Sequence, residues 1–218
     1  MKLNPSRLIL ILMSVAFCVQ LSSCATPPSI RFHSLLALDS GEGIPAAGTE
    51  RLRLALNLTS VTIPAQVDQP QWLVRNADGS LSLLEQERWV APLRGELRAA
   101  LLDRWSQAWA AQGAPDGGKT AANEVAKDAS WQVNIDVTRW EAVPGREVKL
   151  ESRWTARSGL LMLSCRSSIR EAASSENSTY VLALAASHRR AVIRLADEVA
   201  SRLRASQKAE PLVCAGVQ

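Results

Sequence analysis

Hydrophobic and polar residues alternate along several segments of the first half of the chain, and this period of two predicts β-strands. The clearest case spans residues 51–63, where the even-numbered leucines share one face: Leu52, Leu54, Leu56 and Leu58. A shorter strand is expected within 30–38. Two more, at 71–75 and 80–84, flank the segment 76–79 (Asn-Ala-Asp-Gly), which is typical of a hairpin turn.

Two segments show the helical period instead, with apolar residues every three or four positions. The first begins at Pro92, where the missing N–H of proline costs nothing, and is expected to end near Gln112. Its apolar stripe is Leu93, Leu97, Leu101, Trp105, Ala108 and Trp109. The second helix is expected at 179–206, with Thr179 or Ser178 as its cap. Its stripe is Val181, Leu184, His188, Val192, Leu195, Val199 and Leu203.

Three further strands are expected between the helices, at 130–140, 147–156 and 159–169, joined by tight turns that indicate an antiparallel meander. This order of strands, helix, strands and helix predicts one α+β domain. In it, an antiparallel sheet carries two helices packed on it.

The N-terminus has the pattern of a secretory signal peptide. Lys2 and Arg7 precede an apolar run at 8–21, and Ser22, Ser23 and Cys24 follow it. The order Leu-Ser-Ser-Cys is typical of a bacterial lipobox. We therefore expect a signal peptide at 1–23, a lipidated Cys24 with a linker at 24–30, and the folded domain at 31–218.

The anchor changes how composition and charge are interpreted. Removal of residues 1–23 from the 218-residue chain leaves 195, enough for one domain with a sizeable core. The loss of Lys2 and Arg7 lowers the formal charge from +4 to +2, and no dense basic tract indicates a nucleic-acid partner. Ala25, where inner-membrane lipoproteins usually carry Asp, favours the outer membrane, facing the periplasm.

Residues 113–120 match the phosphate-binding pattern G-x-x-x-x-G-K-T. That motif needs a buried strand before the loop and a helix after it, so that backbone N–H groups surround the phosphate. Here a helix precedes the loop, so Lys119 is interpreted as part of a solvated loop, and we expect no cofactor.

The sequence offers no catalytic set and no metal-ligand spacing. His188 is expected in the core of the last helix, and His33 has no evident carboxylate or nucleophile beside it. No G-x-S-x-G elbow occurs. Cys165 and Cys214 remain after processing, in a compartment that permits disulfides; they form either a disulfide or two buried thiols.

Two segments carry a family resemblance. The first is Leu58-Thr-Ser-Val-Thr-Ile-Pro-Ala-Gln-Val-Asp-Gln-Pro-Gln-Trp-Leu-Val-Arg75, and the second is Glu87-Arg-Trp-Val-Ala-Pro-Leu93. With the lipobox and the short strand at 31–35, they resemble the PqiC/YmbA-type lipoproteins, auxiliary components of ABC-type and MCE-type intermembrane transport systems. The departures are Gln66, Gln69 and Ala91, where that family has an aromatic residue, an arginine and an acid.

The resemblance implies a non-enzymatic lipoprotein on the outer membrane that contacts an MCE-domain (PqiB-like) protein and its transporter and assists lipid traffic. Ring-like self-association is an expectation that rests on the resemblance alone. The segment 66–75 is expected to be exposed and to bind the partner through Gln69, Gln71, Trp72 and Arg75, since Trp and Arg commonly anchor interfaces. Two other functions stay open: a structural envelope lipoprotein that binds a protein or glycan, and a periplasmic hydrolase.

Overall fold

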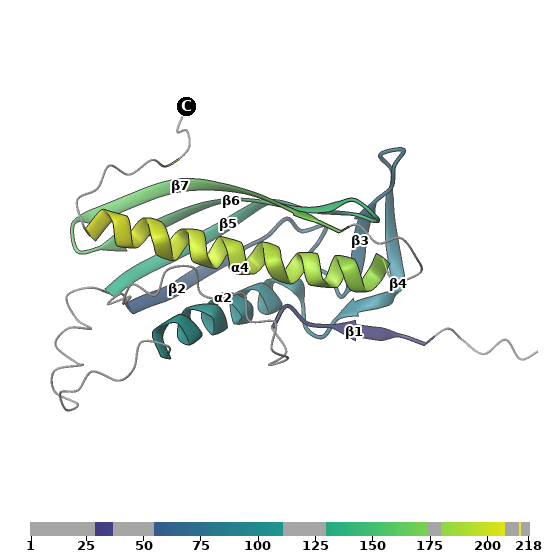
Figure 1. Ribbon diagram of the computed structural model, residues 1–218, viewed down its shortest axis with the longest axis horizontal. Helices are drawn as coiled ribbons and strands as arrows, with labels where there is room; N and C mark the ends of the chain where they lie inside the picture. Colours follow the sequence, from purple (N-terminus) through teal and green to yellow (C-terminus); the bar gives the residue numbers. More distant parts are fainter. Residues whose placement is uncertain (1–28, 37–54, 111–129, 174–179, 208–213, 215–218) are drawn as a thin grey trace, which may run out of the picture.

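A computed structural model of the protein describes residues 29–36, 55–110, 130–173, 180–207 and 214 (Figure 1). The expected signal peptide, Cys24 and the loop 113–120 lie outside the described residues. No helix in the described part is long and apolar enough to cross a membrane.

Within the described residues, seven strands form two sheets rather than one. The smaller sheet has the order β1-β4-β3, made of β1 (Arg31–His33), β4 (Leu81–Trp89) and β3 (Gln71–Arg75). The larger has the order β2-β5-β6-β7, made of β2 (Ala55–Thr62), β5 (Ser130–Val143), β6 (Glu147–Ser158) and β7 (Leu161–Ala172).

The α+β class and the meander β5-β6-β7 are confirmed, but the expectation of one antiparallel sheet needs correction. β1 pairs with β4, and β2 with β5, in parallel. A long connection that carries a helix lets β2 and β5 run in the same direction, which a tight turn cannot do. Alternation along a strand indicates which face is buried, but it does not indicate whether the neighbouring strand runs parallel or antiparallel.

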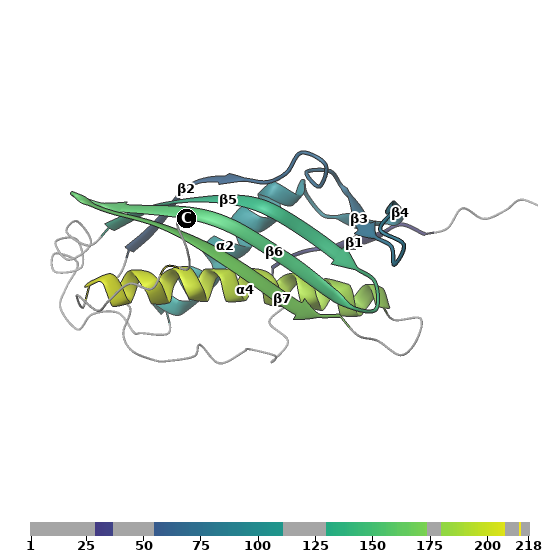
Figure 2. The same ribbon diagram turned by 90° about the horizontal axis from the view of Figure 1, so that it is seen from above.

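In the part of the chain that the structure describes, two helices cover one face of the larger sheet: α2 (Leu93–Ala110) and α4 (Tyr180–Gln207). Figure 2 shows them side by side beneath the strands, with α4 along β6 and β7. The indole Nε1 of Trp105 on α2 donates a hydrogen bond of 3.0 Å to the carbonyl of Ala196 on α4. All seven residues expected in the apolar stripe of the last helix are buried.

Two register shifts redirect side chains within the larger sheet. The alternation in β2 holds as far as Leu58, and a bulge between Leu58 and Ser60 then turns Val61 inward. A second shift, between Val137 and Arg139, brings Trp140 into the core. Strict alternation from the sequence misses both positions.

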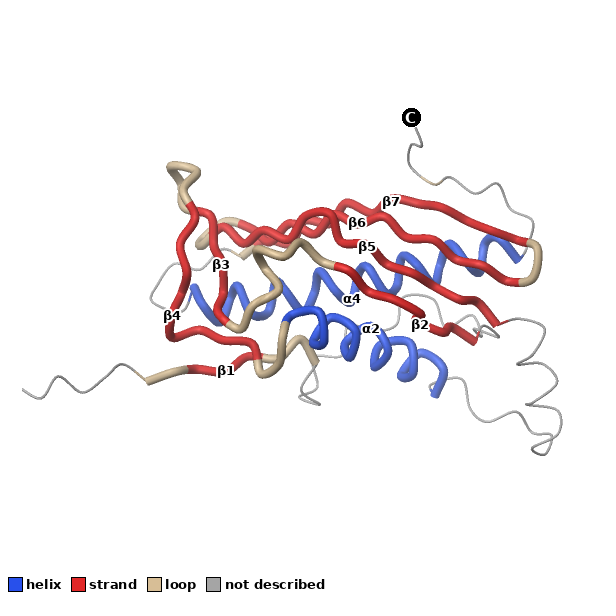
Figure 3. The backbone as a smooth tube through the Cα atoms, turned by 180° about the vertical axis from the view of Figure 1, so that it is seen from behind, coloured by secondary structure: helices blue, strands red, loops and turns tan. Residues whose placement is uncertain are grey.

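The molecule is elongated, and β1 lies at one end of it. The connection between β6 and β7 lies at the other end (Figure 3). The nine residues of β6 from Leu150 to Ser158 span about 26 Å at the rise of a β-strand. The candidate functional site lies at the β1 end.

Candidate functional site

Glu87, near the end of β4, holds β1 in place through two basic side chains. Arg31 forms an ion pair with its Oε1, and the imidazole Nε2 of His33 lies 2.7 Å from its Oε2. The Glu87 side chain is only 5% exposed. Parallel pairing of Arg31 with Glu87 and of His33 with Trp89 brings these residues to the same edge of the sheet.

A second carboxylate holds the chain just after β1. Glu96, in the first turn of α2, accepts hydrogen bonds from Oγ of Ser34 at 2.7 Å and from the backbone N–H of Leu35 at 2.9 Å. Glu96 is itself buried. The N-terminal strand is therefore fixed at two points, to the small sheet and to α2.

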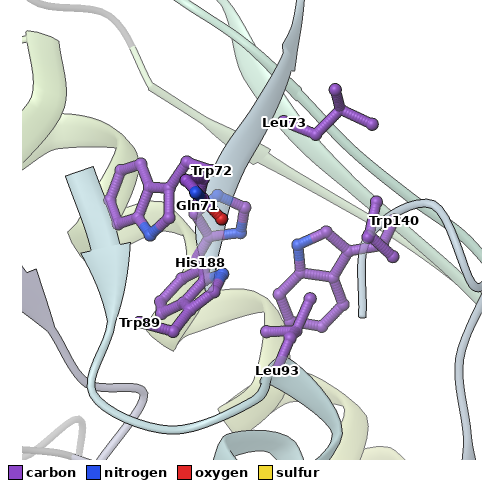
Figure 4. Close-up of a pocket in the computed structure, with 8 residues that line it drawn as sticks. Gln71, Trp72, Leu73, Trp89, Leu93, Trp140 and His188 are labelled. Carbon is purple, nitrogen blue, oxygen red and sulfur yellow. The ribbon is translucent and has the colours of Figure 1, made fainter. Parts of the chain in front are cut away.

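An aromatic cluster of five residues lies beside this junction: His33, Trp72, Trp89, Trp140 and His188. The ring of Trp72 lies 4.4 Å from that of His33 and 4.8 Å from that of Trp89, centroid to centroid. Trp140 stacks on His188 at 5.3 Å with an angle of 8° between the planes. Figure 4 shows Trp72, Trp89, Trp140 and His188 gathered around one pocket.

Burial controls the charge of this cluster. Removal from water lowers the pKa of His188 from 6.5 to about 3, and the nearby charges of His33 and Arg189 add to the shift. Burial alone would raise the pKa of Glu87, but hydrogen bonds from Arg31 and His33 outweigh it, so the pKa lies below its usual value. At neutral pH the cluster thus holds a neutral His188 near an ionised Glu87.

The pocket is too small for a substrate. It is lined by Gln71, Trp72, Trp89, Leu93, Trp140 and His188, among others, and has room for about one water molecule. Two buried atoms on its lining residues, Nε1 of Trp72 and Nδ1 of His188, have no hydrogen-bond partner among the described residues.

His33 and Glu87 are two members of a possible catalytic set, but the third is absent from the described part of the chain. The nearest serine in sequence, Ser34, donates to Glu96 instead. No group of three or more His, Cys, Asp or Glu residues in the described ranges could hold a metal ion. The arrangement orders β1 and the aromatic cluster.

The segment 64–75, which ends with β3, is held in place by hydrogen bonds and ion pairs along its length. Asp68 forms an ion pair with Arg94 in the first turn of α2. Gln69 donates from Nε2 to the backbone carbonyl of Gln66 at 3.1 Å. Arg75 donates to the carbonyl of Gly79 at 2.9 Å and to Oε1 of Glu141 at 2.8 Å.

Comparison with known proteins identifies the family of this chain. The model of the family described as "ABC-type transport auxiliary lipoprotein component" matches residues 36–200. The chain belongs to this family. The match confirms the resemblance to PqiC/YmbA-type lipoproteins that the sequence carries. A search of curated proteins finds no match.

Two solved structures have a fold similar to that of this auxiliary lipoprotein. One is a Xanthomonas campestris protein of the DUF330 family, with a TM-score of 0.53 at 15% identity over 84% of this chain and 96% of that one. The other is described as an uncharacterized protein, with a TM-score of 0.53 at 15% identity over 79% of this chain and 99% of that one. At this identity the likeness extends to the fold alone.

The expected exposure of Trp72 is wrong. The Trp72 side chain of this auxiliary lipoprotein is 2% exposed, packed between His33, Trp89 and His188, and is not available to a partner. Alternation along β3 turns Trp72 and Val74 inward. Gln71 and Arg75 alternate with them and are partly exposed, and Gln69 is partly exposed in the turn before β3.

Cys165 and Cys214 of this auxiliary lipoprotein lie together. Cys165, buried on the inner face of β7, and Cys214, partly buried against the core, are paired with their Cα atoms 5.0 Å apart. That separation is within the range of disulfides. The bond itself stays a prediction.

The sequence missed the residues that matter most at this site. His33 was expected to have no carboxylate beside it, yet Glu87 bonds it from 54 residues away. The distance in sequence hides such a contact, because only the parallel pairing of β1 with β4 creates it. The buried positions of Glu87 and Glu96 gave no signal in the spacing of apolar residues.

Proposed function

We propose that the protein is an outer-membrane lipoprotein, anchored through Cys24 and facing the periplasm, that serves as a non-enzymatic accessory component of an MCE/ABC-type intermembrane lipid transport system. In this role it supports the integrity of the membrane. The observation that carries the proposal is the match of residues 36–200 to the auxiliary lipoprotein family. The order of lipobox, linker and folded body in the sequence supports it.

The geometry of β1 suits an anchored protein. The linker at 24–30 leads directly into Arg31–His33, and the carboxylates of Glu87 and Glu96 fix that strand and the residues after it. Any pull from a lipid anchor would act on β1 first. A strand held by buried, charge-assisted hydrogen bonds resists such a pull better than a loosely packed terminus.

Partner contact remains the proposed role of the surface beside β3, in a revised form. Gln69, Gln71 and Arg75 supply polar groups on this surface. Trp72 is buried on the opposite, inner face of β3. Arg75 is held by Gly79 and Glu141, so its guanidinium is already oriented before a partner arrives. Pre-orientation lowers the entropic cost of binding. The proposed partner is an MCE-domain protein together with its transporter.

The alternatives differ in what supports them. An envelope lipoprotein that binds another protein or a glycan would use the same anchor and the same surface, and only the partner distinguishes it. A periplasmic hydrolase has the His33–Glu87 pair in its favour. The pocket beside that pair, however, has room for about one water molecule, too little for a substrate.

The test is purification of the lipidated protein from envelopes, followed by mass spectrometry of the proteins and lipids that accompany it. An MCE-domain protein is the expected partner. The triple variant Gln69→Ala, Gln71→Ala and Arg75→Ala should weaken its capture, whereas Arg98→Ala with Gln107→Ala, exposed on α2, should leave it unchanged. Equal capture by both variants would remove the surface beside β3 from the interface.

A further inference from the structure

We infer that the tip of the β6–β7 hairpin is a second membrane-contact site, which inserts into a bilayer containing anionic phospholipid. Leu160 in the turn is fully exposed, and Leu161 and Met162 at the start of β7 are 59% and 69% exposed. Three consecutive apolar side chains at the end of a hairpin contribute nothing to the core. The inference goes beyond the proposed transport role and does not depend on the identity of a partner.

The directions of these side chains favour lipid over a flat protein surface. Successive residues of a strand point to opposite faces, so Leu161 and Met162 project from opposite sides of the hairpin, and Leu160 caps its end. A partner that covered one face would leave the other in water. A lipid layer surrounds an inserted tip and removes all three side chains from water together.

Three arginines on the outer face of the hairpin supply the charge that an anionic surface requires. Arg157 pairs in register with Met162, and Arg153 pairs directly with Arg166. The three arginines, Arg153, Arg157 and Arg166, are all exposed. No carboxylate of the described residues forms an ion pair with any of them. The acid in register with Arg153, Asp136 on β5, accepts a hydrogen bond from Thr62 instead.

The pairing of Arg153 with Arg166 is unfavourable for the fold itself. Like charges directly opposite each other on neighbouring strands destabilise a sheet. The cost is relieved when anionic headgroups lie against the same face, and each arginine near such a surface then strengthens binding. The apolar tip and the arginines without an ion-pair partner are thus both stabilised by an anionic lipid surface.

This site lies at the opposite end of the molecule from β1 (Figures 1 and 3). A lipid on Cys24 would hold the β1 end near the bilayer, since seven extended residues to Arg31 reach at most about 25 Å. A second contact at Leu160 would therefore lay the long axis of the body along the membrane, with the outer face of β6 and β7 toward the headgroups.

The experiment places an environment-sensitive fluorophore on the tip of the full-length protein. Leu160→Cys is labelled with the dye NBD in the folded protein, where Cys165 is buried, and the protein is reconstituted in vesicles without any partner. The vesicles contain phosphatidylcholine alone, or phosphatidylcholine with about one third phosphatidylglycerol. Asp78→Cys, at the polar tip of the β3–β4 hairpin, is the matched control.

We expect a blue shift and quenching by doxyl-labelled lipid at position 160 in the anionic vesicles, and neither at position 78. Arg153→Gln with Arg166→Gln should lower the ratio of inserted to free tip about 25-fold, since each arginine contributes about fivefold. Arg98→Gln, on α2, should leave the ratio unchanged. An unquenched probe at 160, or equal quenching at 160 and 78, would overturn the inference, as would shielding only after a protein partner is added.

Discussion

Nε2 of His33 lies 2.7 Å from Oε2 of Glu87, although 54 residues separate them in the sequence. The contact joins the strand that follows the proposed lipid linker to the end of β4, and His33 is itself a member of the aromatic cluster, packed against Trp72. Fixation of β1 and packing of the aromatic cluster are therefore one structural feature, and substitutions of Glu87 and Trp72 separate their contributions.

Glu87→Gln should destabilise the protein by roughly 1–3 kcal/mol, because it removes a buried negative charge that accepts hydrogen bonds from Arg31 and His33. Chemical denaturation measures the change, and hydrogen exchange should show faster exchange within residues 30–36. Glu85→Gln, exposed on the same strand, should stay within about 0.5 kcal/mol of wild type. Equal values for the two variants would mean that Glu87 does not hold β1.

Acid should weaken the fold through His188. Its pKa is lowered to about 3 in the folded protein, so between pH 6.5 and about 3 the unfolded chain binds a proton that the folded one does not. The free energy of unfolding therefore falls as the pH is lowered, by up to about 1.4 kcal/mol per pH unit.

The test of this pH dependence compares wild type with His188→Leu between pH 6.5 and 5. Glu87, whose pKa is lowered, contributes its stability above its usual pKa and loses it only at more acid pH, so it does not disturb that window. His33, Arg189 and Glu87, which face His188 or its neighbours, are unchanged in the variant. The same slope in both proteins would show that His188 is protonated in the folded state.

Trp72→Ala should unfold or severely destabilise the domain, by about 3–5 kcal/mol, since its indole packs against three other rings of the cluster. Arg75→Ala, two residues along β3, should cost about 1 kcal/mol or less, because its side chain is partly exposed. Thermal unfolding distinguishes them. A small effect of Trp72→Ala would restore this side chain as a surface residue.

The sequence patterns predicted which side chains of a helix or strand are buried, but not which strands pair. The stripe of α4 from Val181 to Leu203 was predictable, because a helix buries every third or fourth residue whatever it packs against. Trp72 was misplaced because it lies in the segment 66–75, which was expected to be exposed, and because its residue type favoured a surface role. Alternation with Val74 in β3 indicated burial instead. The parallel pairing of β1 with β4 could not be predicted from the sequence, since no local pattern of residues indicates which strands pair.

Arg153→Gln with Arg166→Gln should leave the free energy of unfolding unchanged or raise it by several tenths of a kcal/mol, because two like charges no longer face each other across β6 and β7. Denaturant titration in the absence of lipid measures this. A loss of stability would mean that the two guanidinium groups stabilise the fold. The unfavourable pairing of Arg153 with Arg166 would then no longer support the membrane role inferred for them.

Cys165 and Cys214 should be joined by a disulfide, since they are paired with their Cα atoms 5.0 Å apart. Thiol labelling under denaturing, non-reducing conditions should modify neither residue, and two labelled cysteines would contradict the pairing. Replacing both by alanine should lower the free energy of unfolding by roughly 2–4 kcal/mol, through release of the closed loop in the unfolded chain.

The most direct test of the proposed function is affinity purification of the protein from outer membranes, with wild type and Cys24→Ala side by side and mass spectrometry of what is captured. We predict that wild type fractionates with the outer membrane and brings an MCE-domain protein and its transporter. The Cys24→Ala variant should be unprocessed and lost from that membrane. Wild-type protein that is retained in the outer membrane but captures no MCE-domain protein would contradict the transport role.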